Sequence, residues 1–350
     1  MKKKSIRHAL GGTALAALAF GAGAQDVQIY GVADVYVGSV RGSSTKTVVD
    51  DGGNAASRLG FRGREDLGGG HAAYFALEMG MLVDVGTTAV SSGFGRQAFV
   101  GYRAPWGSLE AGRQYTPLFF NLLATVPFGM NVNWAPVQMS TSMDGQPAAV
   151  RALGFPLRQS NLLRYRYGGG PNAKGLNVDV VAAPGEGATN SGDMVGFGAS
   201  YRGDHFFIGY AGQRIDSGTA AVTKFRNEIQ GVNGSYTLGA WTISGAHLVS
   251  DSRLPGGRRA AHTVLGLAHD AGPHRWMLEA NRRDLKGSPN DALAIALGYD
   301  HRLSKRTALY GRLLHLSNRG TAFNALAQAV VNAGSGDDVR AVALGVRHNF

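Results

Sequence analysis

Residues 27–37 read VQIYGVADVYV, and the character of the side chain changes at almost every step. The odd-numbered residues are all apolar or glycine, whereas the even-numbered residues include Gln28, Asp34 and two tyrosines. Successive side chains of a β-strand point to opposite faces, so this segment predicts a strand with one apolar and one polar face. A helix over the same residues would scatter the polar groups around its whole circumference.

The same alternation recurs along the rest of the chain, and it predicts sixteen strands. They are expected at 27–37, 57–63, 71–81, 95–103, 108–114, 160–168, 174–183, 192–202, 204–214, 226–237, 239–250, 260–269, 273–283, 290–301, 305–317 and 338–350. An even number of strands places both chain termini on the same side, as single-chain bacterial barrels require.

The connections between these strands alternate in length. Short turns such as 105–107 and 238–240 are followed by long polar loops such as 38–56 and 318–337. The one long uncharged stretch, 114–143, contains three prolines and lacks a window of about 20 apolar residues that could span a bilayer. In lipid, only helices and closed barrels satisfy the hydrogen bonds of every backbone N–H and C=O group. We therefore predict an all-β fold: a transmembrane antiparallel β-barrel of 16 strands.

The N-terminus has the pattern of a secretory signal peptide. Lysines at positions 2–4 precede an uncharged stretch rich in alanine and leucine at 9–20, and Ala22-Gly23-Ala24 provides small residues for cleavage. We therefore predict a signal peptide over 1–24 and a mature barrel over 25–350. Removing the three lysines and Arg7 lowers the net charge from +11 to +7. The chain has no cysteine, which excludes a disulfide scaffold and a thiolate metal site.

Several segments spread over the chain resemble the general diffusion porin family of Gram-negative outer membranes. The matching pieces are IYGVAD at 29–34, SRLGFRGREDLG at 57–68, RQAFVG at 96–101, GSLEAGRQ at 107–114 and LSKRTALY at 303–310. The chain also ends in GVRHNF, with a terminal phenylalanine on an amphipathic strand. Together these pieces extend over the mature chain from end to end.

This resemblance implies sixteen strands, a homotrimer in the bacterial outer membrane and passive diffusion of small hydrophilic solutes. The implied partners are outer-membrane lipid, lipopolysaccharide, the barrel-assembly machinery, and small anionic and neutral solutes. Phe350 resembles the C-terminal signal that the barrel-assembly machinery reads.

The resemblance also implies where the pore is narrowest. The longest connection, roughly residues 115–156, would fold into the lumen as a constriction loop, which is a functional exception to the rarity of long structureless loops. The residues that match the family's constriction are the loop tip at Pro127, Phe128 and Gly129, and the arginines Arg58, Arg96 and Arg158, with Arg113 as a fourth.

Strand alternation gives a separate expectation for two of these arginines. Apolar residues at 59 and 61 share one face of their strand, so Arg58 falls on the opposite, inward face. Leucine and tyrosines at 163, 165 and 167 are expected to face outward, which turns Arg158, Arg164 and Arg166 inward.

The direction of Arg96 follows from the strand expected over 95–103. Placing Phe99 and Gly101 on the outward face puts Arg96 on the inward face. The three constriction arginines are therefore expected to converge on one wall.

The charges in this part of the chain are unbalanced. Between Glu110 and Asp179 the sequence has a single acid, Asp144. The basic residues in the same interval are Arg113, Arg151, Arg158, Arg164, Arg166 and Lys174. Unpaired guanidinium groups in a narrow passage concentrate anions and repel cations, so we predict a pore that prefers anions. The pattern leaves open whether Asp144 or an acid of another strand, such as Glu78, lies at the narrowest point.

Other motifs are weak, and we predict no metal, no cofactor, no nucleic-acid partner and no enzymatic activity. The glycines at 93 and 95 fit a dinucleotide fingerprint but open into a strand rather than a helix. Three alternatives remain. A substrate-specific channel, with an aromatic surface for sugars or a dedicated anion site, stays open because of the aromatic residues Phe119, Phe120, Phe128 and Trp134 of the predicted loop. The others are an outer-membrane barrel hydrolase and a structural or adhesive barrel.

Overall fold

The computed structural model describes residues 26–90, 93–141, 155–185, 192–219, 222–253, 257–322 and 336–350. The predicted signal peptide and Asp144 lie outside these ranges. Within them, no helix is long and apolar enough to cross a membrane.

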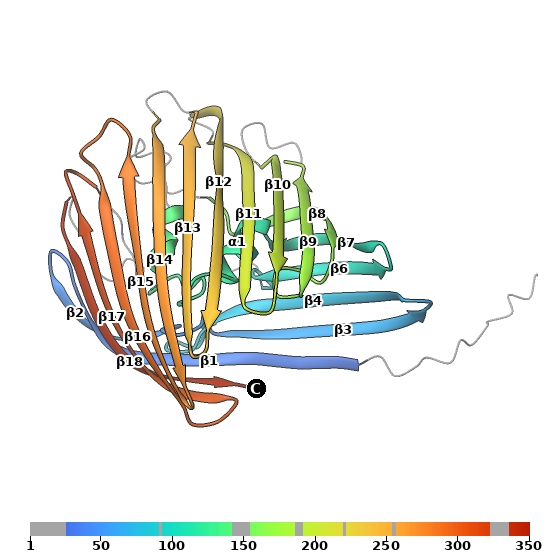
Figure 1. The fold of residues 1–350 in the computed structure, drawn as a ribbon, viewed down its shortest axis with the longest axis horizontal. Coiled ribbons are helices and arrows are strands. Elements are labelled where there is room, and N and C mark those ends of the chain that lie inside the picture. The colour runs from blue at the N-terminus through green and yellow to red at the C-terminus, as the bar shows by residue number, and fades with distance from the viewer. Residues whose placement is uncertain are drawn as a thin grey trace, which may run out of the picture.

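Strands dominate the described residues (Figure 1). The elements are β1 (Asp26–Arg41), β2 (Thr45–Asp51), β3 (Arg58–Gly68), β4 (His71–Leu82), β5 (Thr87–Thr88), β6 (Gln97–Ala104), β7 (Gly107–Tyr115), α1 (Pro117–Leu123), the 3-10 helix η1 (Pro136–Thr141), β8 (Arg158–Tyr167), β9 (Gly175–Ala183), β10 (Met194–Arg202), β11 (Phe206–Thr219), β12 (Val222–Leu238), β13 (Trp241–Ser252), β14 (Arg259–Ala271), β15 (His274–Leu285), β16 (Ala292–Arg302), β17 (Thr307–Asn318) and β18 (Val339–Asn349).

The strands form one closed antiparallel barrel, because β1 pairs with β18 as well as with β2 and β3. Residues 26–32 of β1 pair with β3 and residues 35–41 pair with β2, so β2 and β3 are two halves of one barrel strand. The two-residue β5 pairs only with the end of β4. Eighteen assigned strands therefore make sixteen strands of the barrel wall, which confirms the predicted fold.

One predicted loop is wrong. Residues 38–56 contain the end of β1 and the whole of β2, so the true connection at this point is only 42–44. The barrel strand then breaks at 52–57, where the chain turns around the buried carboxylate of Asp34. That carboxylate accepts hydrogen bonds from the backbone N–H groups of Gly53, Asn54 and Ala55 at 2.7–3.0 Å. A buried acid is thus satisfied by the backbone that leaves the sheet.

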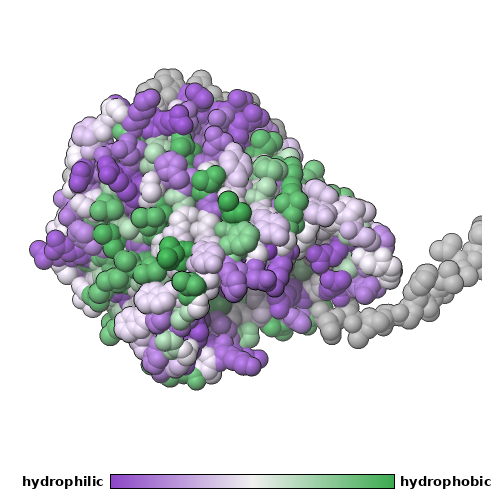
Figure 2. All heavy atoms as spheres, in the orientation of Figure 1, coloured by the Kyte–Doolittle hydropathy of each residue, from purple (hydrophilic) through white to green (hydrophobic). Residues whose placement is uncertain are grey.

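The two faces of the wall differ in the way that the alternation predicts. In β16, Leu293, Ile295 and Leu297 are exposed, whereas the alanines at 292, 294 and 296, which alternate with them, are buried. Figure 2 shows hydrophobic residues spread across the middle of the visible face and hydrophilic residues gathered at the upper rim. An apolar surface of this extent on the outside, together with a polar inside, is the arrangement of a barrel that sits in lipid.

The segment between β7 and β8 lies against the inward face of this wall. It opens with α1, whose N-cap Thr116 accepts a hydrogen bond from the Phe119 N–H through its hydroxyl oxygen. Helix α1 contacts β9–β12, whereas η1 contacts β14–β16, so the segment crosses from one side of the barrel interior to the other. Figure 1 shows α1 among the strands rather than outside them.

Candidate functional site

Four arginines and one glutamate gather on the inner wall formed by β3, β4, β6, β7 and β8. Glu78 of β4 lies between Arg58 and Arg96: its Oε2 is 3.5 Å from Arg58 Nε, and its Oε1 is 2.7 Å from Arg96 Nε. Arg96 and Arg158 both donate to the hydroxyl oxygen of Tyr115, at 2.7 and 3.0 Å. The Arg158 guanidinium also lies over the Tyr115 ring, 4.5 Å from its centre. The tyrosine therefore joins two arginines that would otherwise repel each other.

Arg113 joins the same region from β7. Its Nε donates to the Gly95 carbonyl at 2.6 Å, directly before Arg96, and its terminal nitrogen donates to the Ser160 hydroxyl at 2.9 Å. We call Arg58, Arg96, Arg113 and Arg158 the arginine cluster. Among the described residues, no carboxylate lies within 4 Å of Arg113 or Arg158. Four positive charges thus share one negative charge, Glu78, which leaves three positive charges in excess.

The expected direction of β6 is wrong, although Arg96 still reaches the cluster. Val100 and Tyr102 are the exposed residues of β6, and Gly101 pairs with the buried Glu110, so Phe99 and Gly101 face inward. Strict alternation would then turn Arg96 outward. Arg96 lies one residue before β6 begins, where the strand geometry no longer fixes its direction, and Glu78 holds its side chain on the inner side.

A second group of charges lies farther along β8 and is neutral. Arg164 lies 2.9 Å from Asp179 and 3.3 Å from Glu110, and Arg166 lies 3.4 and 3.6 Å from the same two acids. We call Arg164, Arg166, Glu110 and Asp179 the paired group. The expectation that Arg164 and Arg166 are uncompensated is therefore wrong, because acids of the neighbouring strands β7 and β9 neutralise them. Their direct cross-strand partners are these acids: Glu110 opposes Arg164, and Asp179 opposes Arg166.

The predicted loop tip rests on the opposite wall, between β14 and β17. The Pro127 ring lies over Gly266, where a Cβ would come within 2.5 Å of its Cδ, and the Phe128 ring lies over Gly298 in the same way. The ring of Phe128 also faces the Arg312 guanidinium, with 5.6 Å between its centre and the guanidinium carbon. Gly129 has a φ of +59°, which favours glycine. Small residues on the wall therefore make room for the tip.

A buried acid fixes the same part of the segment. Glu279 of β15 is fully covered, and its carboxylate accepts hydrogen bonds from the backbone N–H groups of Val137 at 2.8 Å and Phe128 at 3.3 Å. Asn281, two residues farther on, donates to the Pro136 carbonyl at 2.9 Å. Glu279 and Asn281 of the inner wall thus bind the backbone of the segment at 128 and at 136–137.

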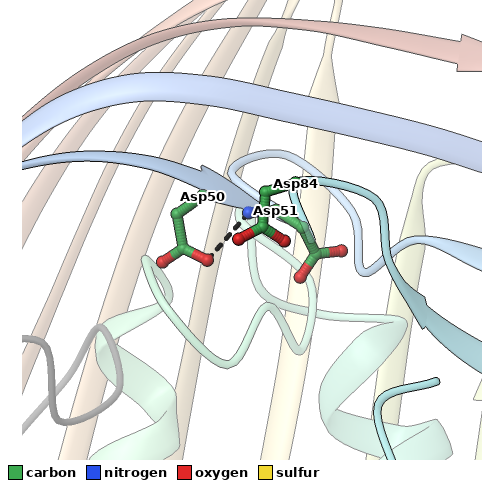
Figure 3. A group of neighbouring side chains, drawn as sticks. All are labelled: Asp50, Asp51 and Asp84. Carbon is green, nitrogen blue, oxygen red and sulfur yellow. Dashed lines mark hydrogen bonds between the residues drawn. The ribbon is translucent and has the colours of Figure 1, made fainter. Parts of the chain in front are cut away.

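Three further acids converge near the extended end of β2. The carboxylates of Asp50, Asp51 and Asp84 lie within 4.8 Å of one another (Figure 3). Asp50 accepts from the Tyr36 hydroxyl at 2.9 Å and from the Asp51 N–H at 2.8 Å, and Asp84 is exposed. Asp51 also accepts from the Ser57 N–H at 3.3 Å, directly before Arg58.

Sequence reasoning missed Tyr115 and Glu279 as functional positions, and it named Glu78 only as an open alternative. Tyr115 sits at the end of β7 directly opposite Arg158, so a register drawn for β7 and β8 would have indicated the contact. Glu279 stands at a position of β15 that alternation assigns to the inward face, but nothing in the pattern shows which backbone groups it binds.

The chain terminus closes the barrel. The Phe350 N–H donates to the Gly31 carbonyl at 3.1 Å, and Phe350 accepts from the Gly31 N–H at 3.0 Å. Its ring covers Gly31 on the outward face. These contacts join the last residue to β1; recognition of Phe350 by the barrel-assembly machinery stays a prediction.

Comparison with known proteins supplies the family. The family described as Gram-negative porin matches residues 11–321. The outer membrane porin protein 32 of Delftia acidovorans is 30% identical over the full length of both chains, and the major outer membrane protein P.IB of Neisseria gonorrhoeae is 29% identical over 74% of each chain.

Solved structures of porins share the fold of this chain. An anion-selective porin from Comamonas acidovorans superposes with a TM-score of 0.82 at 26% identity, covering 93% of this chain and 100% of that one. The trimer form of OmpT from Vibrio cholerae shares the fold at 14% identity, with a TM-score of 0.69 over 93% of this chain and 99% of that one. The chain therefore belongs to the Gram-negative porin family, and it is a channel protein of the outer membrane rather than an enzyme.

Proposed function

We propose that the segment between β7 and β8 narrows the pore and that the arginine cluster at this constriction makes it prefer small anions. The observation that carries the proposal is the excess of three positive charges among Arg58, Arg96, Arg113, Arg158 and Glu78. A passage lined by one sign of charge concentrates ions of the opposite sign and repels like ions. The similarity to an anion-selective porin points in the same direction.

The solutes that fit this site are small anions and small neutral hydrophilic molecules. A sugar-specific channel needs aromatic faces open to the pore, and the aromatic residues of the inserted segment are mostly covered. Trp134 is fully buried, Phe119 and Phe128 are each 8% exposed, and Phe119 is stacked on Tyr115 with ring centres 4.0 Å apart. These rings stabilise the segment itself, which favours a general pore over the substrate-specific alternative.

The proposed assembly is a homotrimer, supported by the trimer form of a porin with the same fold. The constriction lies within one barrel, so the proposed selectivity needs no residue from a neighbouring copy. The mass of the detergent-solubilised protein tests the assembly independently of ion selectivity.

The test of the selectivity is the reversal potential of the purified protein in a planar bilayer that separates two concentrations of potassium chloride. A potential of the sign set by chloride supports the proposal. A potential of the sign set by potassium overturns it. Replacing Arg158 by Gln in the same experiment should move the potential toward zero, because one of the three excess charges is removed.

A further inference from the structure

The outward face of β13–β18 carries an unbroken row of directly paired residues near one end of the barrel. In order around the wall they are Trp241, His269, Trp276, Tyr299, Gly311 and Leu344. The short turns 239–240, 272–273 and 303–306 lie at this end; they join β12 to β13, β14 to β15 and β16 to β17, and β18 also ends here. Short turns face the periplasm in outer-membrane barrels, so the row lies at the periplasmic surface of the membrane.

The aromatic members of the row are in contact with one another. The Trp276 and Tyr299 rings lie 4.3 Å apart between centres, and the Trp241 and His269 rings lie 4.2 Å apart. Tryptophan and tyrosine concentrate at membrane surfaces, where one end of the ring is in hydrocarbon and the other is wet.

A pair of imidazoles lies one step nearer the turns. His274 and His301 are cross-strand partners, and their rings stack with 4.8 Å between centres. The Nδ1 of His274 is 2.7 Å from the Tyr299 hydroxyl and 3.3 Å from the Nδ1 of His301. These contacts use Nδ1 of both rings, and Nε2 of each half-buried ring is left for a group outside the protein. One ring must carry the hydrogen between the two Nδ1 atoms, so the neutral pair offers one Nε2–H donor and the singly protonated pair offers two.

An apolar groove opens beside the aromatic row, on the side toward the membrane centre. Its volume is about 400 Å³, and Leu297, Leu313 and Val342 line it together with the row itself. Gly311 interrupts the row between Tyr299 and Leu344. A Cβ at Gly311 would meet nothing closer than Leu344 Cδ2 at 3.5 Å, so the space over this glycine is open rather than filled by a neighbour.

We propose that this corner binds one phospholipid of the periplasmic leaflet, with an acyl chain in the groove over Gly311 and the phosphate at Nε2 of His274 and His301. The order along the strands matches such a molecule: leucines first, then tryptophan and tyrosine, then imidazoles. A phosphate oxygen accepts strong hydrogen bonds from N–H donors, and the phosphate anion favours the protonated histidine pair, which has two such donors at Nε2.

The charged residues nearby do not compete for the headgroup. Asp270, Arg275 and Arg302 occupy the inward positions of the same strands, and Asp270 binds Arg275 at 3.0 Å and Arg302 at 2.7 Å. The proposal is independent of the ion preference of the pore.

The test is native mass spectrometry of the full-length purified protein in mild detergent, titrated with phosphatidylglycerol, with diacylglycerol and with inorganic phosphate. We expect one phosphatidylglycerol per chain. We expect diacylglycerol, which lacks the phosphate, to bind about tenfold more weakly, a difference typical of one or two lost charge-assisted hydrogen bonds. Inorganic phosphate in millimolar excess should neither bind nor displace the lipid.

Two variants separate binding of the lipid headgroup from binding of the acyl chain. His274→Ala combined with His301→Ala should weaken phosphatidylglycerol about tenfold and leave diacylglycerol unchanged. Gly311→Leu should weaken both lipids, because the added side chain fills the groove. The matched controls are His247→Ala and Gly245→Leu, an outward histidine and an outward glycine of β13 that are away from this corner. Both controls should bind as the unaltered protein does.

Several outcomes would overturn the proposal. Equal binding of phosphatidylglycerol by the unaltered protein and both variants would show that the corner holds no lipid. Displacement by inorganic phosphate would show a site for the free anion instead. Loss of oligomer mass in the variants without loss of lipid would identify the corner as a contact between copies. Unchanged heat resistance in electrophoresis confirms that each variant is folded, and Gly311→Leu keeps the test valid if the double histidine variant fails to fold.

Discussion

Arg158 and Arg164 lie six positions apart on β8, and both point to the inside of the barrel, yet their surroundings are opposite. Arg164 is fully buried between Asp179 and Glu110, and Arg166 shares the same two acids. The described partner of Arg158 is Tyr115, through both its hydroxyl and its ring. Arg158 belongs to a cluster with one acid for four arginines. One part of the wall is neutral, and the other carries three excess charges.

The comparison shows that the number of inward-facing arginines says little about the field in a pore. A guanidinium matched by carboxylates at about 3 Å acts as part of the wall, because its charge is cancelled where it stands. A guanidinium held by neutral groups keeps its charge available to ions in the water. Tyr115 makes this arrangement stable, since its hydroxyl and ring accept two arginines without neutralising either.

The largest expected effect is on stability, and it belongs to the paired group. Arg164→Met removes one of the two arginines that balance two buried acids and leaves one buried negative charge uncompensated, so we expect the unfolding free energy to fall by about 3–5 kcal/mol. Arg158→Met, the matched control on the same strand, loses one hydrogen bond to a neutral group and should cost about 1 kcal/mol. Urea unfolding of the purified barrels measures both. Equal losses would mean that the two arginines play the same structural part.

The second effect is on selectivity, and it belongs to the arginine cluster. Arg158→Glu changes the local charge by two units. A unit charge about 6 Å from a passing ion in water contributes about 0.7 kcal/mol, or about threefold. A change of two units should therefore lower the permeability of anions about tenfold and raise that of cations about tenfold, so the anion-to-cation permeability ratio should fall about a hundredfold. The reversal potential in a salt gradient measures the ratio.

The control for this variant is the double change Arg166→Gln with Glu110→Gln, which removes one charge of each sign from the paired group. It should leave the permeability ratio nearly unchanged, because the net charge of the wall is the same. A shift as large as that of Arg158→Glu would show that the paired group also sets the field.

Most of the fold was predictable because the membrane imposes a strict rule on every strand. Lipid on one side and water on the other select alternate residues, and that alternation is visible in segments such as 27–37. The rule fails where the membrane no longer acts. Residues 45–51 of β2 read TKTVVDD, with polar exposed residues at the start of the strand and two acids at its end, so the sequence there looks like a loop.

The site was predictable in its residues but not in its charge balance. Arg58, Arg96 and Arg158 do lie together, although the reason offered for Arg96 was wrong, since its position just before β6 removes it from the alternation. The balance depends on register, which pairs Glu110 with Arg164 and Asp179 with Arg166 across neighbouring strands. Counting acids along the chain between Glu110 and Asp179 excluded the two residues that matter.

Salt should weaken the contrast between the two regions. The distance over which charges act in water falls from about 10 Å at 0.1 M salt to about 3 Å at 1 M, so the field of the arginine cluster is screened. We expect the permeability ratio to fall several-fold between these concentrations, measured at a constant gradient. The stability difference between Arg164→Met and Arg158→Met should change little, because buried pairs are screened much less.

The smaller of the two changes in charge tests the one acid of the arginine cluster. Glu78→Gln raises the excess from three charges to four, so the anion-to-cation permeability ratio should rise about tenfold, opposite in direction to Arg158→Glu. The amide oxygen can still accept a hydrogen bond from Arg96, now 2.7 Å from the carboxylate, so the arginine keeps its place. A ratio that falls instead would mean that Glu78 acts mainly by positioning Arg58 and Arg96. The conductance of the variant distinguishes this outcome, because displaced arginines would change the width of the pore as well as its charge.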